Sequence, residues 1–358
     1  MLGKLFAKKV PLMVGIDIGS HSVKAVLLTG EYPHTVEAIA IESMPKDVIQ
    51  DRNITDIEEV GKVIARIRKK IPKTIKYAAA AVSGSTVITK VIFLDAQLSD
   101  DEMESQIELE ADSLIPYPLD EVNIDFERLG LNHADATKEN VLLSAARKES
   151  VEARTGALDN GGFTAKVVDI ESYCSSRAAE LCLSQFPHGA ADKLVGVINI
   201  GHNTLLLSVL HKGETIYTRD QNFGGQALIN ELITTYQLEA DAAEMAATSG
   251  ELPDGDPHQV FERYKQAISQ QVRRSIQMFV TTSGKDNLDY LLVAGGVARM
   301  KGLVEQLQQD TGLPTQLADP FNGITVAPGI NQQLIEQVKP QLMIATGLAL
   351  RSFSTWHI

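Results

Sequence analysis

The sequence predicts an α/β fold made of two related halves that face each other, with a small subdomain inserted into the first half. The main observation is an internal repeat. Gly15–Leu28 has the pattern strand, turn, strand, and Val197–Leu210 repeats it at a constant offset of 182 residues, since Gly19 corresponds to Gly201. A repeat at this spacing is far too long for a solenoid and indicates duplicated domains. A helix–strand–strand–helix segment with its own turn signals, residues 96–162, indicates the insertion.

Composition and charge are those of an ordinary globular chain of 358 residues, 44% hydrophobic and 22% charged. A formal net charge of −13 argues against a general nucleic-acid binder, which needs clustered lysine and arginine. Cys174 and Cys182 lie in one predicted helix at a separation of roughly 12 Å, too far for a disulfide, so we expect a reducing, cytoplasmic setting. No apolar run is long enough to span a bilayer, and residues 1–9 form an apolar and basic tail without signal-peptide features.

In residues 10–95, strands alternate with one helix. The helix is expected because apolar residues recur at a helical spacing between Asp56 and Lys70, and Pro72 ends it. Strands are expected at 13–18, 23–28, 35–43, 77–82 and 87–94. This segment therefore predicts a half-sheet with one covering helix, the first part of the first half (1–95).

The inserted subdomain is expected to begin with a capped helix. Ser99 is a good N-cap residue and Glu102 follows at the capping-box spacing, so a helix over 100–114 is predicted. Its apolar residues form one stripe, and its acids form a face that we interpret as solvated rather than metal-binding. The remaining expected elements are strands at 122–129 and 140–146 and a helix at 149–160.

The rest of the chain completes the first half and builds the second. A strand at 163–168 and a helix at 171–185 precede a linker at 187–192. Further elements are expected at 194–210, 215–219, 226–236, 241–248, 258–281, 290–293, 301–311, 314–318 and 341–354. The predicted domain bounds are 163–190 for the first half's completion, 191–222 for the start of the second half, 223–286 for its smaller subdomain, 287–340 for its completion, and 341–358 for a C-terminal helix that could return to the first half.

The turn Gly19-Ser20-His21-Ser22 is the first candidate site. Successive backbone N–H groups turned to one side can bind an anion, and Asp17 on the preceding strand can hold a divalent cation that bridges to phosphate. The alternative is an ordinary β-hairpin turn, which this stretch alone does not exclude. A third glycine signal, Gly295-Gly296, follows a buried strand, where the backbone can approach a ligand closely.

Taken together, these motifs resemble the actin-like ATPase superfamily, in which two RNase-H-like halves surround a nucleotide cleft. The inserted αββα subdomain looks like that of the FtsA branch. Four motifs are similar to the PilM family of type IV pilus assembly proteins: Gly15-Ile-Asp-Ile-Gly-Ser, Ile115-Pro-Tyr-Pro-Leu-Asp-Glu-Val-Asn-Ile-Asp125, Val168-Asp-Ile-Glu-Ser-Tyr173 and Phe223-Gly-Gly225. The resemblance covers nearly the whole chain.

The resemblance implies a role for each matching residue. Asp17 would lie near Mg²⁺, and Gly19, Ser20 and Ser22 would wrap the β- and γ-phosphates of ATP or ADP. Lys24 would face the phosphates or, equally, the solvent. Gly201, His202, Asn203 and Thr204 would form the second phosphate loop, and Gly295 and Gly296 would pack against the adenosine. Gln271 and Arg274 would lie on the base-and-ribose helix, with core or surface roles as the alternative. Glu171 would position the attacking water, or would simply favour the helix dipole as an N-terminal acid.

The sequence departs from the superfamily pattern at two points. Asn199 stands where most relatives carry Asp, which favours nucleotide binding over fast hydrolysis, so we expect at most a slow ATPase. The chain also ends soon after its expected last helix, without the amphipathic membrane helix of FtsA-type proteins, so membrane attachment is expected only through partners.

The resemblance also implies partners and a location. Relatives in the PilM family bind the cytoplasmic N-terminal tail of the inner-membrane protein PilN in a groove between the first half and the inserted subdomain. The expected protein is thus a cytoplasmic adaptor, peripheral at the inner membrane, that contacts other pilus components and could self-associate. The alternatives are a sugar-kinase-like phosphotransferase and an FtsA-like division protein. No Gly-x-x-x-x-Gly-Lys-Ser/Thr motif is present, so a P-loop ATPase is excluded.

Overall fold

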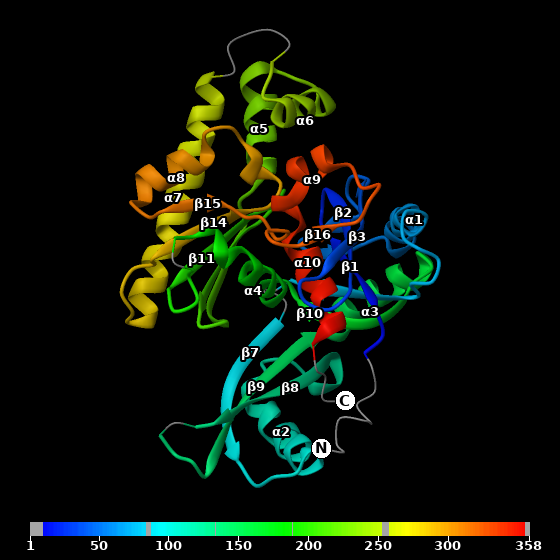
Figure 1. Ribbon diagram of the computed structural model, residues 1–358, viewed down its shortest axis with the longest axis vertical. Helices are drawn as coiled ribbons and strands as arrows, with labels where there is room; N and C mark the ends of the chain where they lie inside the picture. The colour runs from blue at the N-terminus through cyan, green and yellow to red at the C-terminus, as the bar shows by residue number, and fades with distance from the viewer. Residues whose placement is uncertain (1–9, 84–86, 133, 188, 253–257, 355–358) are drawn as a thin grey trace.

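The computed structural model describes residues 10–83, 87–132, 134–187, 189–252 and 258–354 (Figure 1). The tail predicted over residues 1–9 lies outside these ranges. The predicted α/β class is confirmed: two mixed sheets lie side by side, and a third, smaller sheet projects below them in the view of Figure 1.

The first sheet has the strand order β10-β6-β1-β2-β3-β16. Its strands are β1 (Met13–Ile18), β2 (Ser22–Thr29), β3 (Thr35–Ser43), β6 (Tyr77–Val82), β10 (Thr164–Ile170) and β16 (Thr325–Val326). The strands β1, β2 and β3 are antiparallel neighbours, whereas β6 and β10 continue the sheet in parallel on the other side of β1. The six residues of β1 are all buried, which explains its nearly continuous apolar run.

The second sheet repeats this topology. Its order is β13-β12-β11-β14-β15, with β11 (Val195–Ile200), β12 (Leu205–His211), β13 (Glu214–Gln221), β14 (Tyr290–Ala294) and β15 (Thr315–Leu317). The pairings β11–β12 and β12–β13 are antiparallel, and β11–β14 and β14–β15 are parallel. The sequence repeat therefore corresponds to a repeated sheet topology, as expected for duplicated halves.

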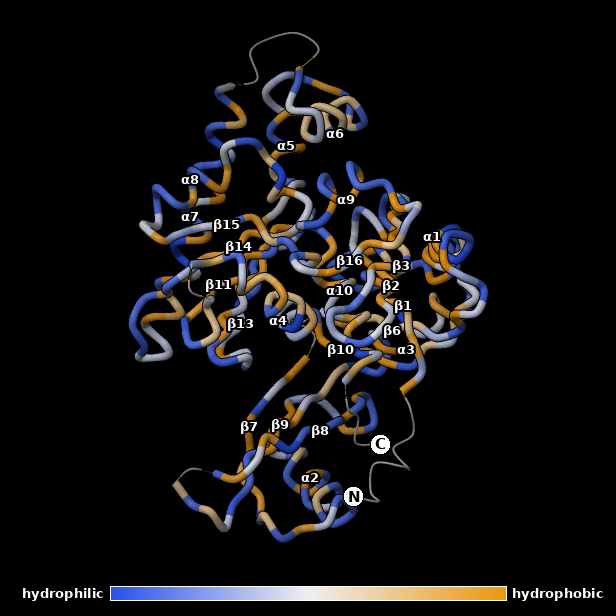
Figure 2. Tube along the Cα trace, viewed as in Figure 1, coloured by the Kyte–Doolittle hydropathy of each residue, from blue (hydrophilic) through white to orange (hydrophobic). Residues whose placement is uncertain are grey.

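Helices cover both sheets and fill the space between them. On the outer side of the first sheet lie α1 (Ile57–Arg68) and α3 (Lys148–Asn160). Between the sheets, α4 (Glu171–Cys182) packs against α10 (Met343–Ala349), and α10 also contacts β1 and β2. Figure 2 shows apolar residues concentrated on these inner elements. A Cβ added at Gly347 would overlap the carbonyl of Cys174, so the two helices are in backbone contact there.

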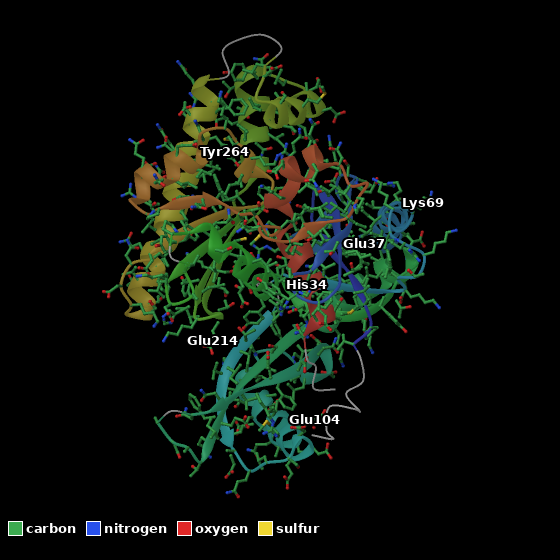
Figure 3. All side chains as sticks on the ribbon, in the orientation of Figure 1. His34, Glu37, Lys69, Glu104, Glu214 and Tyr264 are labelled. Atoms are coloured by element: carbon green, nitrogen blue, oxygen red, sulfur yellow. The ribbon has the colours of Figure 1, made fainter. Side chains whose placement is uncertain are left out.

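The outer side of the second sheet carries α5 (Gly225–Tyr236), α6 (Ala240–Ser249), α7 (His258–Ser283) and α8 (Leu303–Thr311). Apolar residues of α7 recur every three or four positions and are buried in this core: Val260, Tyr264, Ile268, Val272, Ile276 and Phe279. Figure 3 labels Tyr264 inside this half. None of the described helices is both long and apolar enough to cross a bilayer.

The inserted subdomain is a three-stranded sheet, β7-β9-β8, covered by α2 (Asp100–Leu114). The predicted capping box at Ser99 and Glu102 is confirmed. The strands are β7 (Val87–Asp95), β8 (Val122–Leu131) and β9 (Lys138–Arg147). The structure places β7 here rather than in the first half, because β7 pairs with β9 along its whole length and buries Ile92 and Leu94 beneath α2.

The chain returns to the first half earlier than the predicted bound of residue 341. Thr325 and Val326 pair in parallel with the start of β3. Phe321 and α9 (Gln332–Val338), which the sequence reading missed, join the apolar cluster of β2 and β3. The predicted last helix, 341–354, is three shorter pieces: a 3₁₀ turn at Lys339–Leu342, α10, and a 3₁₀ turn at Leu350–Phe353.

Candidate nucleotide cleft

The two repeated hairpin turns close in the same way and face each other. In the first turn, the Gly19 N–H donates to the Ser22 carbonyl at 3.1 Å, and in the second, the Gly201 N–H donates to the Thr204 carbonyl at 2.8 Å. The imidazole rings of His21 and His202 stack with their centroids 5.0 Å apart. The turns of the two halves therefore meet across the interface between them.

A cleft of about 790 Å³ lies between the two turns. This volume is in the range that small-molecule sites occupy. Most of the predicted site residues line it: Asp17, Gly19, Ser20, Lys24, Glu171, Gly201, His202, Asn203, Thr204, Gly295 and Gly296. Ser22 is not among the lining residues, because it is buried behind the turn, where its carbonyl accepts the Gly19 hydrogen bond. The topology thus brings together residues more than 270 positions apart (17 to 296).

Lys24 faces the cleft and not the solvent. It lies directly opposite Asp17 in the β1–β2 register, and its Nζ is 3.1 Å from Asp17 Oδ2. The two side chains are only 13% and 9% exposed. Because this pair is shielded from water, an anion entering the cleft would compete with Asp17 for the ammonium group.

Gly295 occupies a position that only glycine fits. Its φ is +92°, and an added Cβ would overlap the Ile200 carbonyl and lie 2.6 Å from Asn199 Oδ1. Its N–H donates to the Pro340 carbonyl at 2.8 Å. The end of β14 is therefore pressed against the end of β11, which keeps the backbone at the cleft wall free of side-chain bulk.

The second turn is supported from behind by the start of α5. The N–H groups of Gly225 and Gln226 donate to the carbonyls of Gly201 and His202 at 3.0 and 2.8 Å. A Cβ at Gly224 would lie 2.6 Å from the Gly201 carbonyl, which explains the glycine pair. Burial lowers the pKa of His202, with His21 as the second cause, so its imidazole is neutral at neutral pH.

Glu171 is the first residue of α4 and lines the cleft at the end of β10. Burial raises the pKa of its carboxyl to about 7, and the nearby Asp17 carboxylate raises it further, while Arg154, Arg52 and Lys24 act in the opposite direction. A carboxyl with this pKa can take up or release a proton near neutral pH, as a general base or acid must.

The donor set fits Mg²⁺ only together with a phosphate ligand. Asp17 offers a carboxylate, but its counterpart in the second half is the neutral Asn199. Among the described residues, no group of three or more His, Cys, Asp or Glu side chains could hold a metal ion. Mg²⁺ commonly binds through one or two carboxylates, several waters and the phosphates of a substrate. Asp17 suits that mode.

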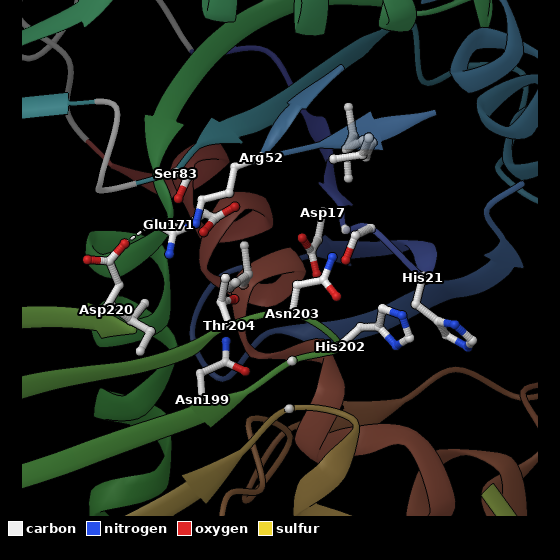
Figure 4. Close-up of a pocket in the computed structure, with 18 of the residues that line it drawn as sticks. Asp17, His21, Arg52, Ser83, Glu171, Asn199, His202, Asn203, Thr204 and Asp220 are labelled. Atoms are coloured by element: carbon white, nitrogen blue, oxygen red, sulfur yellow. Dashed lines mark hydrogen bonds and ion pairs between the residues drawn. The ribbon is translucent and has the colours of Figure 1, made fainter. Parts of the chain in front are cut away.

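Three charged residues at the cleft were not anticipated from the sequence: Arg52, Arg154 and Asp220. Figure 4 shows Arg52, Glu171 and Asp220 on one side of Asp17 and the two histidines on the other. Arg154 had a usable signal, since a charged residue interrupts the stripe of small and apolar residues at Ser150, Ala153 and Ala157. Arg52 had none, because it lies in a short polar turn.

The Arg52 turn is conformationally unusual. Asp51 and Arg52 join β4 (Ile49–Gln50) to β5 (Asn53–Ile54), with φ of +47° and +69°. Two positive φ angles in a two-residue hairpin favour Asn-Gly, and other residues there cost about 1 kcal/mol each. Non-glycine residues in this region often mark functional sites.

Gln271 and Arg274 do not line the cleft. Arg274 lines a separate hollow of about 950 Å³ on the outside of the second half, with Arg273 and Gln277. The reason is the helical period: Arg274 follows the buried Val272 by two residues, about 200° around α7, and so points away from the core. A nucleotide role for these two residues finds no support in this geometry.

Two duplicated sheets with a cleft between their hairpin turns define an actin-like fold. In agreement, the chain resembles ethanolamine utilization protein EutJ from Carboxydothermus hydrogenoformans, with 16% identity, a TM-score of 0.57 and coverage of 95% of this chain and 90% of that chain. A chain of a PilM-PilN type IV pilus biogenesis complex is 22% identical, with a TM-score of 0.81 over 96% of this chain and 99% of that chain.

The family can also be stated. The family model for type IV pilus assembly protein PilM matches residues 15–353. The protein therefore belongs to the PilM family of type IV pilus assembly proteins, as its motifs predicted.

Proposed function

We propose that the protein is a nucleotide-binding adaptor of the type IV pilus inner-membrane assembly complex. In this proposal it binds ATP or ADP with Mg²⁺ in the cleft, and it binds the cytoplasmic N-terminal tail of PilN. It is held at the inner membrane through such partners. The single observation that carries the nucleotide part is the pair of hairpin turns that face each other across a cleft lined by Gly295 and Gly296.

The chemistry of the cleft supports a polyphosphate ligand. Turns of small residues offer backbone N–H groups to an anion, and Lys24 supplies a shielded positive charge beside them. Asp17 would hold Mg²⁺ against the phosphates. Asn199 gives weaker ordering of metal and water than a second carboxylate, so turnover is expected to be slow even with Glu171 as the water-orienting base.

The partner assignment rests on the family and on the likeness to a chain from a PilM-PilN complex. The inserted subdomain offers a feature that suits a short peptide. Its strand β7 is an edge strand, and Val91 and Phe93 on it are 48% and 58% exposed. An extended peptide beside the first half and this subdomain would gain main-chain hydrogen bonds and apolar anchors.

Calorimetric titration with Mg-ATP tests the nucleotide part. Asp17→Ala should weaken Mg-ATP binding at least tenfold, while Asp112→Ala on the exposed face of α2 should leave it unchanged. Equal affinities for both variants would remove Asp17 from the metal site. For the partner part, a synthetic PilN N-terminal tail on beads should retain the protein in the presence of nucleotide, and a scrambled tail should not. Retention by neither peptide would refute the adaptor role.

A further inference from the structure

We propose that Arg52 distinguishes a bound nucleoside triphosphate from a diphosphate by exchanging its carboxylate partner, Asp220, for the terminal phosphate. This inference rests on the proposed nucleotide function and adds a residue and a response to it. It follows from the position of Arg52, from what fixes it, and from what it now binds.

Arg52 bridges the two halves inside the cleft. It comes from the β4–β5 turn of the first half, and its Nη1 forms an ion pair with Asp220 on β13 of the second half. Its Nη2 donates to the amide oxygen of Asn222 at 2.9 Å. All three residues line the cleft, and the Arg52 side chain is only 16% exposed. The guanidinium is therefore a shielded cation on the wall of the site.

The backbone under Arg52 is fixed by a second arginine. Arg154 on α3 is 3% exposed, and its guanidinium donates to the carbonyls of Ala81 at 2.5 Å, Ser150 at 2.9 Å and Arg52 at 3.3 Å. The Ser150 hydroxyl also lies 3.3 Å from Asn53 Oδ1. These contacts hold the left-handed turn that aims Arg52 into the cleft. A surface arginine would not require such support.

The location matches the terminal phosphate rather than the nucleoside. Arg52 lies near Glu171, whose carboxyl feels the charges of Arg154 and Arg52. Figure 4 places Arg52, Glu171 and Asp220 together on one side of Asp17, opposite the stacked His21 and His202. A residue that orients the attacking water must lie beside the phosphate that is attacked, so Arg52 is within the neighbourhood of that phosphate and of no other part of a nucleotide.

The partner exchange has a physical driving force. A phosphate offers more charge and more acceptor oxygens than a carboxylate, and a guanidinium binds it with two parallel hydrogen bonds. A diphosphate leaves the Arg52–Asp220 bridge intact, whereas a triphosphate competes for Arg52 and releases Asp220. The bridge between the halves thereby responds to the number of phosphates.

The experiment compares titrations of Mg-AMPPNP and Mg-ADP into the full chain and its variants. Arg52→Ala should lose affinity for AMPPNP roughly 10- to 100-fold, the range for a charge-assisted hydrogen bond, and should change ADP affinity less than about threefold. Asp220→Asn removes the competing charge, so AMPPNP should bind roughly two- to fivefold more tightly, with ADP unchanged.

The opposite signs separate this role from a merely structural bridge, because a structural bridge would make both variants act in the same direction on both nucleotides. The matched control is Lys46→Ala, which removes an exposed bridge between the same halves, Lys46 to Asp241 at 2.6 Å, outside the cleft lining. It should not discriminate between the nucleotides.

The outcomes also separate the inference from the proposed function. If the unaltered protein binds neither nucleotide, both fail. If it binds both, and Arg52→Ala and Asp220→Asn shift AMPPNP and ADP equally, only the role of Arg52 fails. Should Arg52→Ala not fold, Asp220→Asn alone decides, since weaker AMPPNP binding in that variant would overturn the exchange.

Discussion

Replacing Glu171 with glutamine should change how the stability of the protein depends on pH. In the folded chain, burial and then Asp17 raise the pKa of this carboxyl from 4.5 to about 7. Between those values the folded state keeps a proton that the unfolded state has lost. The folded state therefore binds more protons in this window, and its stability falls as the pH rises from about 5 to 7. Glutamine has no such proton to lose.

The magnitude follows from the shift. At 1.36 kcal/mol per pKa unit, a rise from 4.5 to about 7 corresponds to about 3 kcal/mol of stability lost by the unaltered protein across the window. The free energy of unfolding of Glu171→Gln minus that of the unaltered protein should therefore increase by about 3 kcal/mol between pH 5 and pH 8. Solvent reaching the cleft mouth reduces this value, so about 1 kcal/mol is the smallest increase consistent with the reasoning.

Urea denaturation at half-unit pH intervals, followed by tryptophan fluorescence and by far-UV circular dichroism, measures this difference. Asp17→Asn provides a second comparison, because removing the nearby carboxylate should move the midpoint of the pH dependence toward lower pH. A difference between Glu171→Gln and the unaltered protein that stays flat from pH 5 to pH 8 would show that the carboxyl is not shielded. The interpretation of Glu171 as a base poised near neutral pH would then be wrong.

Two further predictions concern the fold. Gly347→Ala should destabilise the protein by about 1–3 kcal/mol, because the new Cβ overlaps the Cys174 carbonyl, whereas Gly156→Ala in α3 meets only an ordinary contact at 3.4 Å and should be neutral or stabilising; thermal melts of both variants check this, and equal melting temperatures would contradict it. Ser99→Ala should remove the capping box of α2 and raise amide hydrogen exchange in its first turn by about tenfold, with Ser105→Ala on the same helix as the unaffected control.

The sequence predicted the fold because the repeat is physical as well as textual. Each hairpin must bury two strands and close one turn, so both copies retain an apolar run, a glycine and a polar turn, and the shared offset survives inspection by eye. The capped helix α2 was predicted over its observed range for a similar reason, since its N-cap and its stop signal are local.

Elements that depend on distant partners were placed less well. The assignment of β7 to the first half failed because an alternating strand does not reveal which sheet it joins, and its partner β9 lies about 50 residues further along the chain. The two-residue strand β16 carries no periodic signal at all. At the cleft, the turns and Gly295 were found from local backbone needs, whereas Arg52 and Asp220 are brought together only by the packing of the two halves.

The order of synthesis gives the last helix a particular importance. Val26, Leu28 and Val36 are made early, but they are covered by Phe321, Val338, Leu342 and Ala345, which leave the ribosome near the end of translation. Until then, the inner face of the first sheet has no cover. The first half therefore cannot complete its folding while the chain is still being made, and a nascent chain paused near residue 320 presents an apolar surface that suits a chaperone.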